Sequence, residues 1–215
     1  MLVGIGVLSV AVALHHPEPA SRSDTTASAL AAIAGEAQEI YSVHGTLILL
    51  MLLTVLCLRE IFRKSGLDGV KLNWGMSLMV IGMTAMSMAA VINGFSIPLF
   101  ASKYPLPLTP ESDAAARAIL MLGSALNRVF ANIAVLATSV SSALIGMAML
   151  RQAGLGRIAG FIGIAVGAIS LGGLMLGLFE LDYAGFNLTN ALLYLWVATV
   201  GLWTAFGNSV RSSPS

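Results

Sequence analysis

Long apolar stretches without charge decide what kind of fold this chain can adopt. Four of them run for 19 or more residues without a single Asp, Glu, Lys or Arg: Trp74 to Phe100, Val129 to Leu150, Ile158 to Phe179 and Leu188 to Phe206. An α-helix rises about 1.5 Å per residue, so about 20 apolar residues cross the roughly 30 Å hydrocarbon core of a bilayer. Each stretch is therefore long enough to form one membrane span.

Two further stretches raise the expected number of spans to six. Ile40 to Leu58 is interrupted only by His44 and small hydroxyl residues. Leu2 to Leu14 has only thirteen residues and would reach about 20 Å as a helix. We expect it to be a short, retained first span. One alternative is a signal-peptide core that ends at Ala11-Val12-Ala13, although no basic segment precedes it. A second alternative is that the true start of the chain lies upstream.

The composition agrees with a bilayer as the solvent. Hydrophobic residues make up 57% of the chain and charged residues 10%, whereas about a quarter of the residues of a soluble domain are charged. The single Cys57 excludes a disulfide framework, and a net charge of +1 excludes a broad nucleic-acid footprint. We predict an all-α bundle of six transmembrane helices forming one membrane domain, with spans at about residues 2–16, 40–62, 74–100, 114–150, 157–179 and 188–207.

The distribution of charge predicts the orientation, because Lys and Arg are enriched in cytoplasmic loops. One side of the predicted bundle carries seven basic and two acidic residues, a net charge of +5: Arg59, Glu60, Arg63, Lys64, Asp68, Lys71, Arg151, Arg157 and Arg211. The opposite side carries four basic and eight acidic residues, a net charge of −4. This pattern predicts a multi-pass protein with both termini in the cytoplasm.

The fourth span is expected to project from the membrane. Nothing breaks the helical pattern between Asp113 and Leu150, which makes about 55 Å of helix and leaves three to four turns outside the hydrocarbon core. Four polar residues recur at steps of seven, four and four, and so share one face: Arg117, Ser124, Arg128 and Asn132. Ser139 lies further along the same helix.

Arg128 is expected at the outer membrane boundary, where an arginine must reach the headgroups or find a partner inside the bundle. Glu180, Asp182 and Asn93 are its predicted partners. If Arg128 binds a ligand instead, a guanidinium favours an anionic headgroup or a carboxylate. The resulting hypothesis is an outward-facing polar pocket that binds a small or lipid-like anionic ligand, lined by Arg128, Asn127, Asn132, Asn93, His44 and Glu180.

The three histidines give an alternative, a metal or haem site. His15, His16 and His44 are all predicted to reach the outer surface, and imidazole is a common ligand of zinc, copper and haem iron. Glu180 would complete such a site. However, the sequence contains no HExxH motif and no pair of histidines four residues apart, so no cofactor is predicted.

The fifth span is rich in glycine. Three pairs of glycines are spaced four residues apart: 156 with 160, 163 with 167, and 173 with 177. This spacing favours close helix packing in lipid. It also allows a third interpretation of the whole chain, an accessory or assembly subunit that docks through this span on a membrane-protein partner or on a second copy of itself.

Methionines form a stripe in the third span. Met76, Met79, Met83 and Met86 follow one another at steps of three, four and three, so they share one face of the helix. We interpret this stripe as packing, with a path for Cu(I) as the alternative. The sequence has no GxSxG elbow, no phosphate-binding Gly loop and no pair of acidic residues within a span, so a non-catalytic role is favoured.

The layout of most of the chain resembles that of small six-helix bacterial membrane proteins of uncharacterised families, and the likeness is specific around residues 14–19 and 43–46. The resemblance is carried by His15-His16-Pro17-Glu18-Pro19 after a short apolar start, by the alanine-rich segment that follows, and by Val43-His44-Gly45. It implies the fold class and an inner-membrane location. It implies no catalytic residues.

Overall fold

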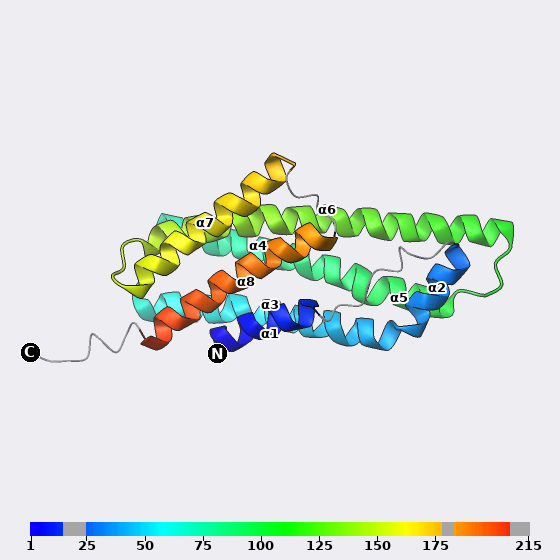
Figure 1. The fold of residues 1–215 in the computed structure, drawn as a ribbon, viewed down its shortest axis with the longest axis horizontal. Helices are drawn as coiled ribbons and strands as arrows, with labels where there is room; N and C mark the ends of the chain where they lie inside the picture. The colour runs from blue at the N-terminus through cyan, green and yellow to red at the C-terminus, as the bar shows by residue number, and fades with distance from the viewer. Residues whose placement is uncertain (15–24, 178–182, 207–215) are drawn as a thin grey trace, which may run out of the picture.

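The computed structural model describes residues 1–14, 25–177 and 183–206, and every regular element within these ranges is a helix (Figure 1). In chain order they are α1 Leu2–Leu14, α2 Thr26–Gly35, α3 Ala37–Ser65, α4 Val70–Val91, the π-helix η2 Ile92–Ser96, α5 Ile97–Lys103, α6 Pro110–Met149, α7 Leu155–Met175 and α8 Tyr183–Phe206. Five helices in the described ranges are long and apolar enough to span a membrane, the continuous helix Val70–Lys103 counting as one. The predicted all-helical, multi-pass class is confirmed at this level.

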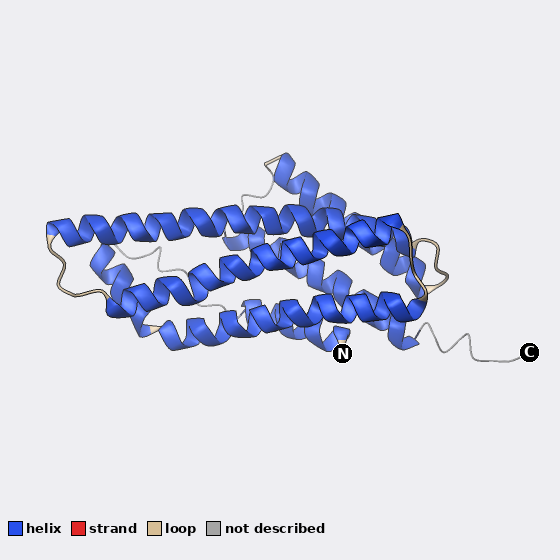
Figure 2. Ribbon diagram, turned by 180° about the vertical axis from the view of Figure 1, so that it is seen from behind, coloured by secondary structure: helices blue, strands red, loops and turns tan. Residues whose placement is uncertain are grey.

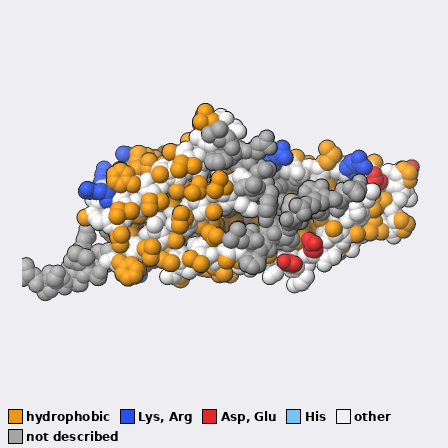
Figure 3. Space-filling view, viewed as in Figure 1, with side chains coloured by type: hydrophobic (Ala, Val, Ile, Leu, Met, Phe, Trp, Pro, Cys, Tyr) orange, Lys and Arg blue, Asp and Glu red, His pale blue; other side chains and the backbone are white. Residues whose placement is uncertain are grey.

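The long helices lie side by side, and the two ends of the molecule differ (Figures 1 and 2). The α3–α4 turn, the α6–α7 turn and the end of α8 lie together at what we call the basic end. The elements α2 and α5 and the start of α6 form the distal end. In Figure 3, Lys and Arg side chains gather at the basic end, and hydrophobic side chains cover the adjoining half of the molecule.

Short turns at the basic end depend on glycine. Gly66 and Gly69 have φ angles of 65° and 109° between α3 and α4, and Gly154 has a φ angle of 56° just before α7. These backbone conformations are accessible to glycine and costly for other residues. The turns therefore allow consecutive long helices to run antiparallel with few connecting residues.

The first helix packs along the last one. A Cβ added at Gly6 would lie 2.8 Å from the Tyr194 carbonyl oxygen, and one at Gly201 would lie 2.9 Å from Leu2 Cβ. Since Leu2 lies beside Gly201 and Gly6 beside Tyr194, the two helices are antiparallel. Leu2 and Ile5 are buried in the main core. With 13 residues, α1 is shorter than the five helices counted above.

The distal end has a small core of its own. Leu30 of α2, Ala101 of α5 and Ala116 of α6 are buried together, with Phe100 and Leu120 packed around them. Both α2 and α6 begin with a capping box. The side chain of the N-cap Thr accepts a hydrogen bond from the backbone N–H of the third helical residue, a Ser, and the side chain of that Ser accepts one from the backbone N–H of the Thr. These caps satisfy backbone N–H groups that would otherwise lack partners and define where the two helices start.

Candidate functional site

The polar face predicted on the fourth span is present on α6, which continues without a break for 40 residues. The side chains of Ser124, Arg128 and Asn132 are exposed, and Asn127 is half-buried. Arg128 forms no ion pair with any residue that the structure describes. In contrast, Arg117 Nη2 lies 3.3 Å from Asp113 Oδ2 on the same helix. Arg128 is therefore the polar-face arginine whose charge the described chain does not neutralise.

Apolar side chains flank Arg128 on the surface. Val129 and Ile133 are 52% and 41% exposed. Exposed aliphatic side chains on a membrane helix face lipid. The guanidinium thus projects from a largely apolar stretch of the α6 surface.

His44 is buried at the contact between α3 and the π-helix. Its side chain is 5% exposed, its Nδ1 lies 2.9 Å from the Ile40 carbonyl oxygen, and the imidazole packs directly on Gly94. A Cβ at Gly94 would clash with the ring, so only glycine allows this contact. Asn93, the neighbour of Gly94, is exposed.

A proline explains the π-helix. Pro98 has no N–H group to donate to the carbonyl of Gly94, and its ring crowds that carbonyl in a regular α-helix. The turn before it widens, and the Ile97 N–H donates to the carbonyl of Ile92, five residues earlier. The widened turn places Gly94 against His44, a position that the regular helical pattern does not predict.

The structure divides the predicted pocket residues into two groups. Gly123 of α6 faces Ile92 and Ile97, and Arg128, five residues later, is rotated from it by about 140°. Arg128 and Asn132 therefore lie on a different side of α6 from the η2 contact, whereas Asn127, four residues after Gly123, is rotated from it by only about 40° and stays on that side. Within the described ranges, Arg128, Asn127, Asn132 and Asn93 form no hydrogen bond with one another. Glu180, His15 and His16 lie outside the described residues.

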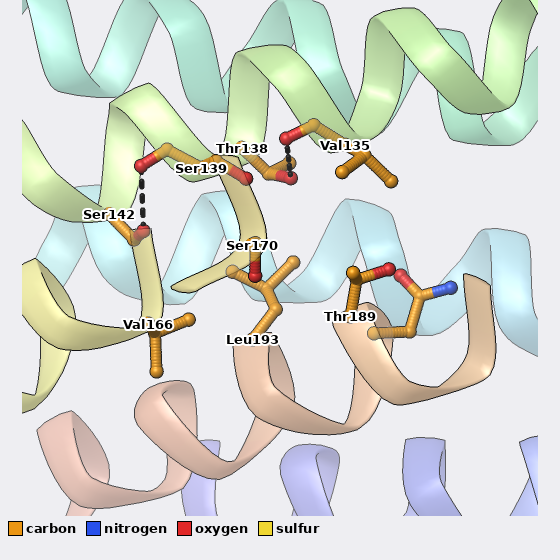
Figure 4. A pocket seen from close by; sticks show the side chains of 9 residues that line it. Val135, Thr138, Ser139, Ser142, Val166, Ser170, Thr189 and Leu193 are labelled. Atoms are coloured by element: carbon orange, nitrogen blue, oxygen red, sulfur yellow. Dashed lines mark hydrogen bonds between the residues drawn. The ribbon is translucent and has the colours of Figure 1, made fainter. Parts of the chain in front are cut away.

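A separate polar cavity of about 10 Å³ lies between α6, α7 and α8 (Figure 4). The described residues of its lining are rich in hydroxyl groups and include no ionisable side chain: Val135, Thr138, Ser139, Ser142, Val166, Ser170, Thr189, Asn190 and Leu193. Of these, the sequence reasoning singled out only Ser139. The signal for the others is the presence of polar residues inside otherwise apolar spans.

The glycines of α7 pack against the chain's own helices. A Cβ at Gly160 would lie 2.8 Å from the Gly146 carbonyl oxygen, and one at Gly163 would lie 2.6 Å from Trp196 Nε1. Trp196 is fully buried there and donates to the Ala159 carbonyl oxygen at 3.1 Å. Gly177 instead has a φ angle of 65° and open space around it. Close packing, the interpretation we favoured, describes the first two glycine pairs.

The methionine stripe is part of the same core. Met79, Met83 and Met86 are buried among apolar neighbours, and the sulfur of Met51 accepts a hydrogen bond from Ser87 Oγ at 3.6 Å. Within the described ranges, no group of three or more His, Cys, Asp or Glu side chains is placed to hold a metal ion.

No protein-family model, curated protein or solved structure matches this chain. The functional interpretation therefore depends on the residues themselves.

Proposed function

We propose that this chain is a non-catalytic membrane protein that binds an anionic oxygen group, that of a phospholipid headgroup, through Arg128 at the distal membrane boundary. The observation that carries the proposal is an exposed guanidinium with no ion-pair partner in the described chain, set in a lipid-facing apolar surface. A guanidinium offers two parallel N–H donors to a phosphate, which a lysine does not.

The length of α6 supports the depth assigned to Arg128. Forty residues make a helix of about 60 Å, twice the thickness of the hydrocarbon core. Counting about 20 residues from Met149 at the basic end reaches the far boundary near residue 130. Arg128 then lies at the level of the headgroups, and the start of α6 extends beyond them.

Asn132 would complete the recognition of a lipid. It is exposed one helical turn deeper than Arg128, about 6 Å along the axis. At that depth a phospholipid presents its ester carbonyl groups, which accept hydrogen bonds from an amide. Ser124 is exposed one turn further out, on the headgroup side. From the outside inwards, Ser124 would thus meet polar headgroup atoms, Arg128 the phosphate and Asn132 the ester groups.

We propose further that α1 is a retained sixth span and that both termini are cytoplasmic, in a bacterial inner membrane. The antiparallel packing of α1 on α8 supports this, because it brings the start of the chain close to the end of the last helix. The basic α3–α4 and α6–α7 turns lie at the same end of the molecule. Basic segments of this kind stay in the cytoplasm.

Cysteine labelling tests this orientation. In a Cys57→Ala background, Ser102→Cys at the distal end and Asp68→Cys at the basic end are both exposed. A membrane-impermeant maleimide applied to intact spheroplasts should label Ser102→Cys alone, and both variants after lysis. Labelling of Asp68→Cys alone in intact spheroplasts would reverse the proposed orientation.

Lipid-dependent stability tests the binding proposal. The purified protein is reconstituted in nanodiscs of phosphatidylcholine, with or without phosphatidylglycerol, and its Tm is measured. Phosphatidylglycerol should raise the Tm of the wild type and of Arg117→Gln, the matched control, and should raise that of Arg128→Gln much less. An additional arm adds inorganic phosphate to phosphatidylcholine nanodiscs. Stabilisation there, with none from phosphatidylglycerol, would identify a soluble anion as the ligand.

A structural role for Arg128 gives a different result. If the arginine serves as an ion-pair partner of Glu180, Arg128→Gln and Glu180→Gln should lower the Tm by similar amounts in both lipid mixtures. The stabilising effect of phosphatidylglycerol would then be unchanged in Arg128→Gln, and the binding proposal would fail.

A further inference from the structure

The cavity between α6, α7 and α8 contains three polar side chains that have no hydrogen-bond partner among the described residues. Ser139, Ser170 and Asn190 are 4%, 3% and 8% exposed, and none of their side chains forms a hydrogen bond with another described residue. They come from three different helices. A polar group buried without a hydrogen bond is costly, and within a membrane no bulk water relieves that cost.

The other hydroxyl groups of the lining are already satisfied. Thr138 Oγ1 donates to the Ala134 carbonyl oxygen at 2.7 Å, Ser142 Oγ to that of Ser139 at 3.0 Å, and Thr189 Oγ1 to that of Phe186 at 2.9 Å. Each of these bonds stays within one helix, the usual arrangement for Ser and Thr in membrane helices. The three unpartnered groups therefore stand apart from the hydroxyl groups around them.

We propose that this cavity is a binding site for a single water molecule that bridges Ser139, Ser170 and Asn190. Its volume of about 10 Å³ is close to the minimum that one water requires. A buried water also needs two to four polar partners, and the three side chains without a described partner all line this cavity. Among the described residues, the lining has no ionisable side chain, which favours a small neutral occupant.

Helix geometry explains why a water site forms at this level. Near the basic end, α6 and α7 touch through Gly146 and Gly160, which leaves no space between the backbones. In Figures 1 and 2, α7 leans away from α6 towards its C-terminal end. The two backbones are still in contact where Gly167 faces the Ser139 carbonyl oxygen, and Ser170 lies one turn further along α7, where α8 contributes Asn190 to the lining. The water fills a gap that direct side-chain contact does not close, and this inference is independent of the role of Arg128.

A double-mutant cycle tests the bridge. Ser170→Ala, Asn190→Ala and the double variant are compared by reversible unfolding in lipid-detergent mixtures. Since both side chains hold the same water, their effects on the unfolding equilibrium constant should be non-additive by about threefold or more. The control pair is Ser170→Ala with Thr199→Ala, because Thr199 Oγ1 bonds within its own helix, to the Trp196 carbonyl oxygen at 2.6 Å. That pair should be additive.

A high-resolution structure completes the test. The proposal expects a solvent peak within about 2.7–3.2 Å of polar atoms of Ser139, Ser170 and Asn190, absent from the Ser170→Ala and Asn190→Ala double variant. Additivity of the first pair together with an empty cavity would overturn it. Coupling without a solvent peak would also overturn it, because a direct Ser170–Asn190 bond would then explain the coupling. If Asn190→Ala does not fold, Ser139→Ala replaces it in the cycle.

Discussion

The two halves of α6 belong to one unbroken helix and are built by different rules. Between residues 131 and 149, twelve residues are buried, and most of them are Ala, Ser, Thr or Gly. Between residues 110 and 130, only Ala116 and Gly123 are buried. The half of α6 near the basic end is thus packed on α4, α7 and α8 through small side chains. The half near the distal end is largely open and carries Arg117 and Arg128.

The contrast shows that helix contacts in lipid and helix contacts in water favour different residue types. Lipid provides no hydrophobic force between helices, so association there depends on close backbone approach and on interhelical hydrogen bonds. The bond from Ser141 Oγ to the Gly75 carbonyl oxygen, 2.7 Å long, is an example from the α4–α6 contact. At the distal end, a buried leucine, Leu30, meets Ala116 instead, as expected where water is available to drive apolar burial.

The largest expected effect comes from filling the small-residue contact. Gly167→Ile places a side chain against the Ser139 carbonyl oxygen and the Ala143 methyl group, so it should lower the free energy of unfolding by about 3 kcal/mol. Gly172→Ile on the same helix meets open space and should be tolerated. Equilibrium unfolding in lipid measures both. A stable Gly167→Ile monomer that has lost a copurifying partner would show that this stripe serves another protein.

The next effect is confined to the distal end. Leu30→Ala removes a fully buried side chain and should cost about 2 kcal/mol of local stability, while the membrane-spanning core stays intact. Hydrogen exchange should therefore accelerate in residues 26–35 and remain slow in residues 131–149. Leu106→Ala, at a half-exposed position of the same end, is the control. Equal acceleration in both segments would mean that the two regions unfold as one unit.

The smallest effect separates an interhelical hydrogen bond from a local one. Ser141→Ala removes the bond to Gly75 and should cost about 0.6 kcal/mol, the usual size of such bonds in membranes. Ser77→Ala removes a bond to the Asn73 carbonyl oxygen within α4 and should be close to neutral. Indistinguishable unfolding curves for the two variants would remove Ser141 from the account of α4–α6 packing.

The positions of the five long helices could be predicted from the sequence, because a lipid environment requires long apolar stretches. The packing role of Gly160, Gly163 and Gly167 could be predicted for a similar reason, since their spacing has a direct steric meaning. The short α1 could not be decided in this way, because thirteen apolar residues also suit a signal segment.

The polar cavity and the position of His44 could not be predicted. In a helix that is apolar on every side, the sequence does not reveal which face turns inward, so Ser170 and Asn190 could not be assigned to a common site. The contact between His44 and Gly94 depends on the π-turn before Pro98, which breaks the regular period. The pocket hypothesis thus identified Arg128 and Asn132 on one face and joined to them residues that the fold places elsewhere.

Native mass spectrometry of lipids retained by the protein tests the central claim about Arg128 most directly. The wild type and Arg117→Gln, released from membranes containing phosphatidylglycerol, should keep bound phosphatidylglycerol under conditions where Arg128→Gln loses most of it. Equal retention by all three proteins would contradict the account, because the exposed guanidinium on α6 would then have no part in binding.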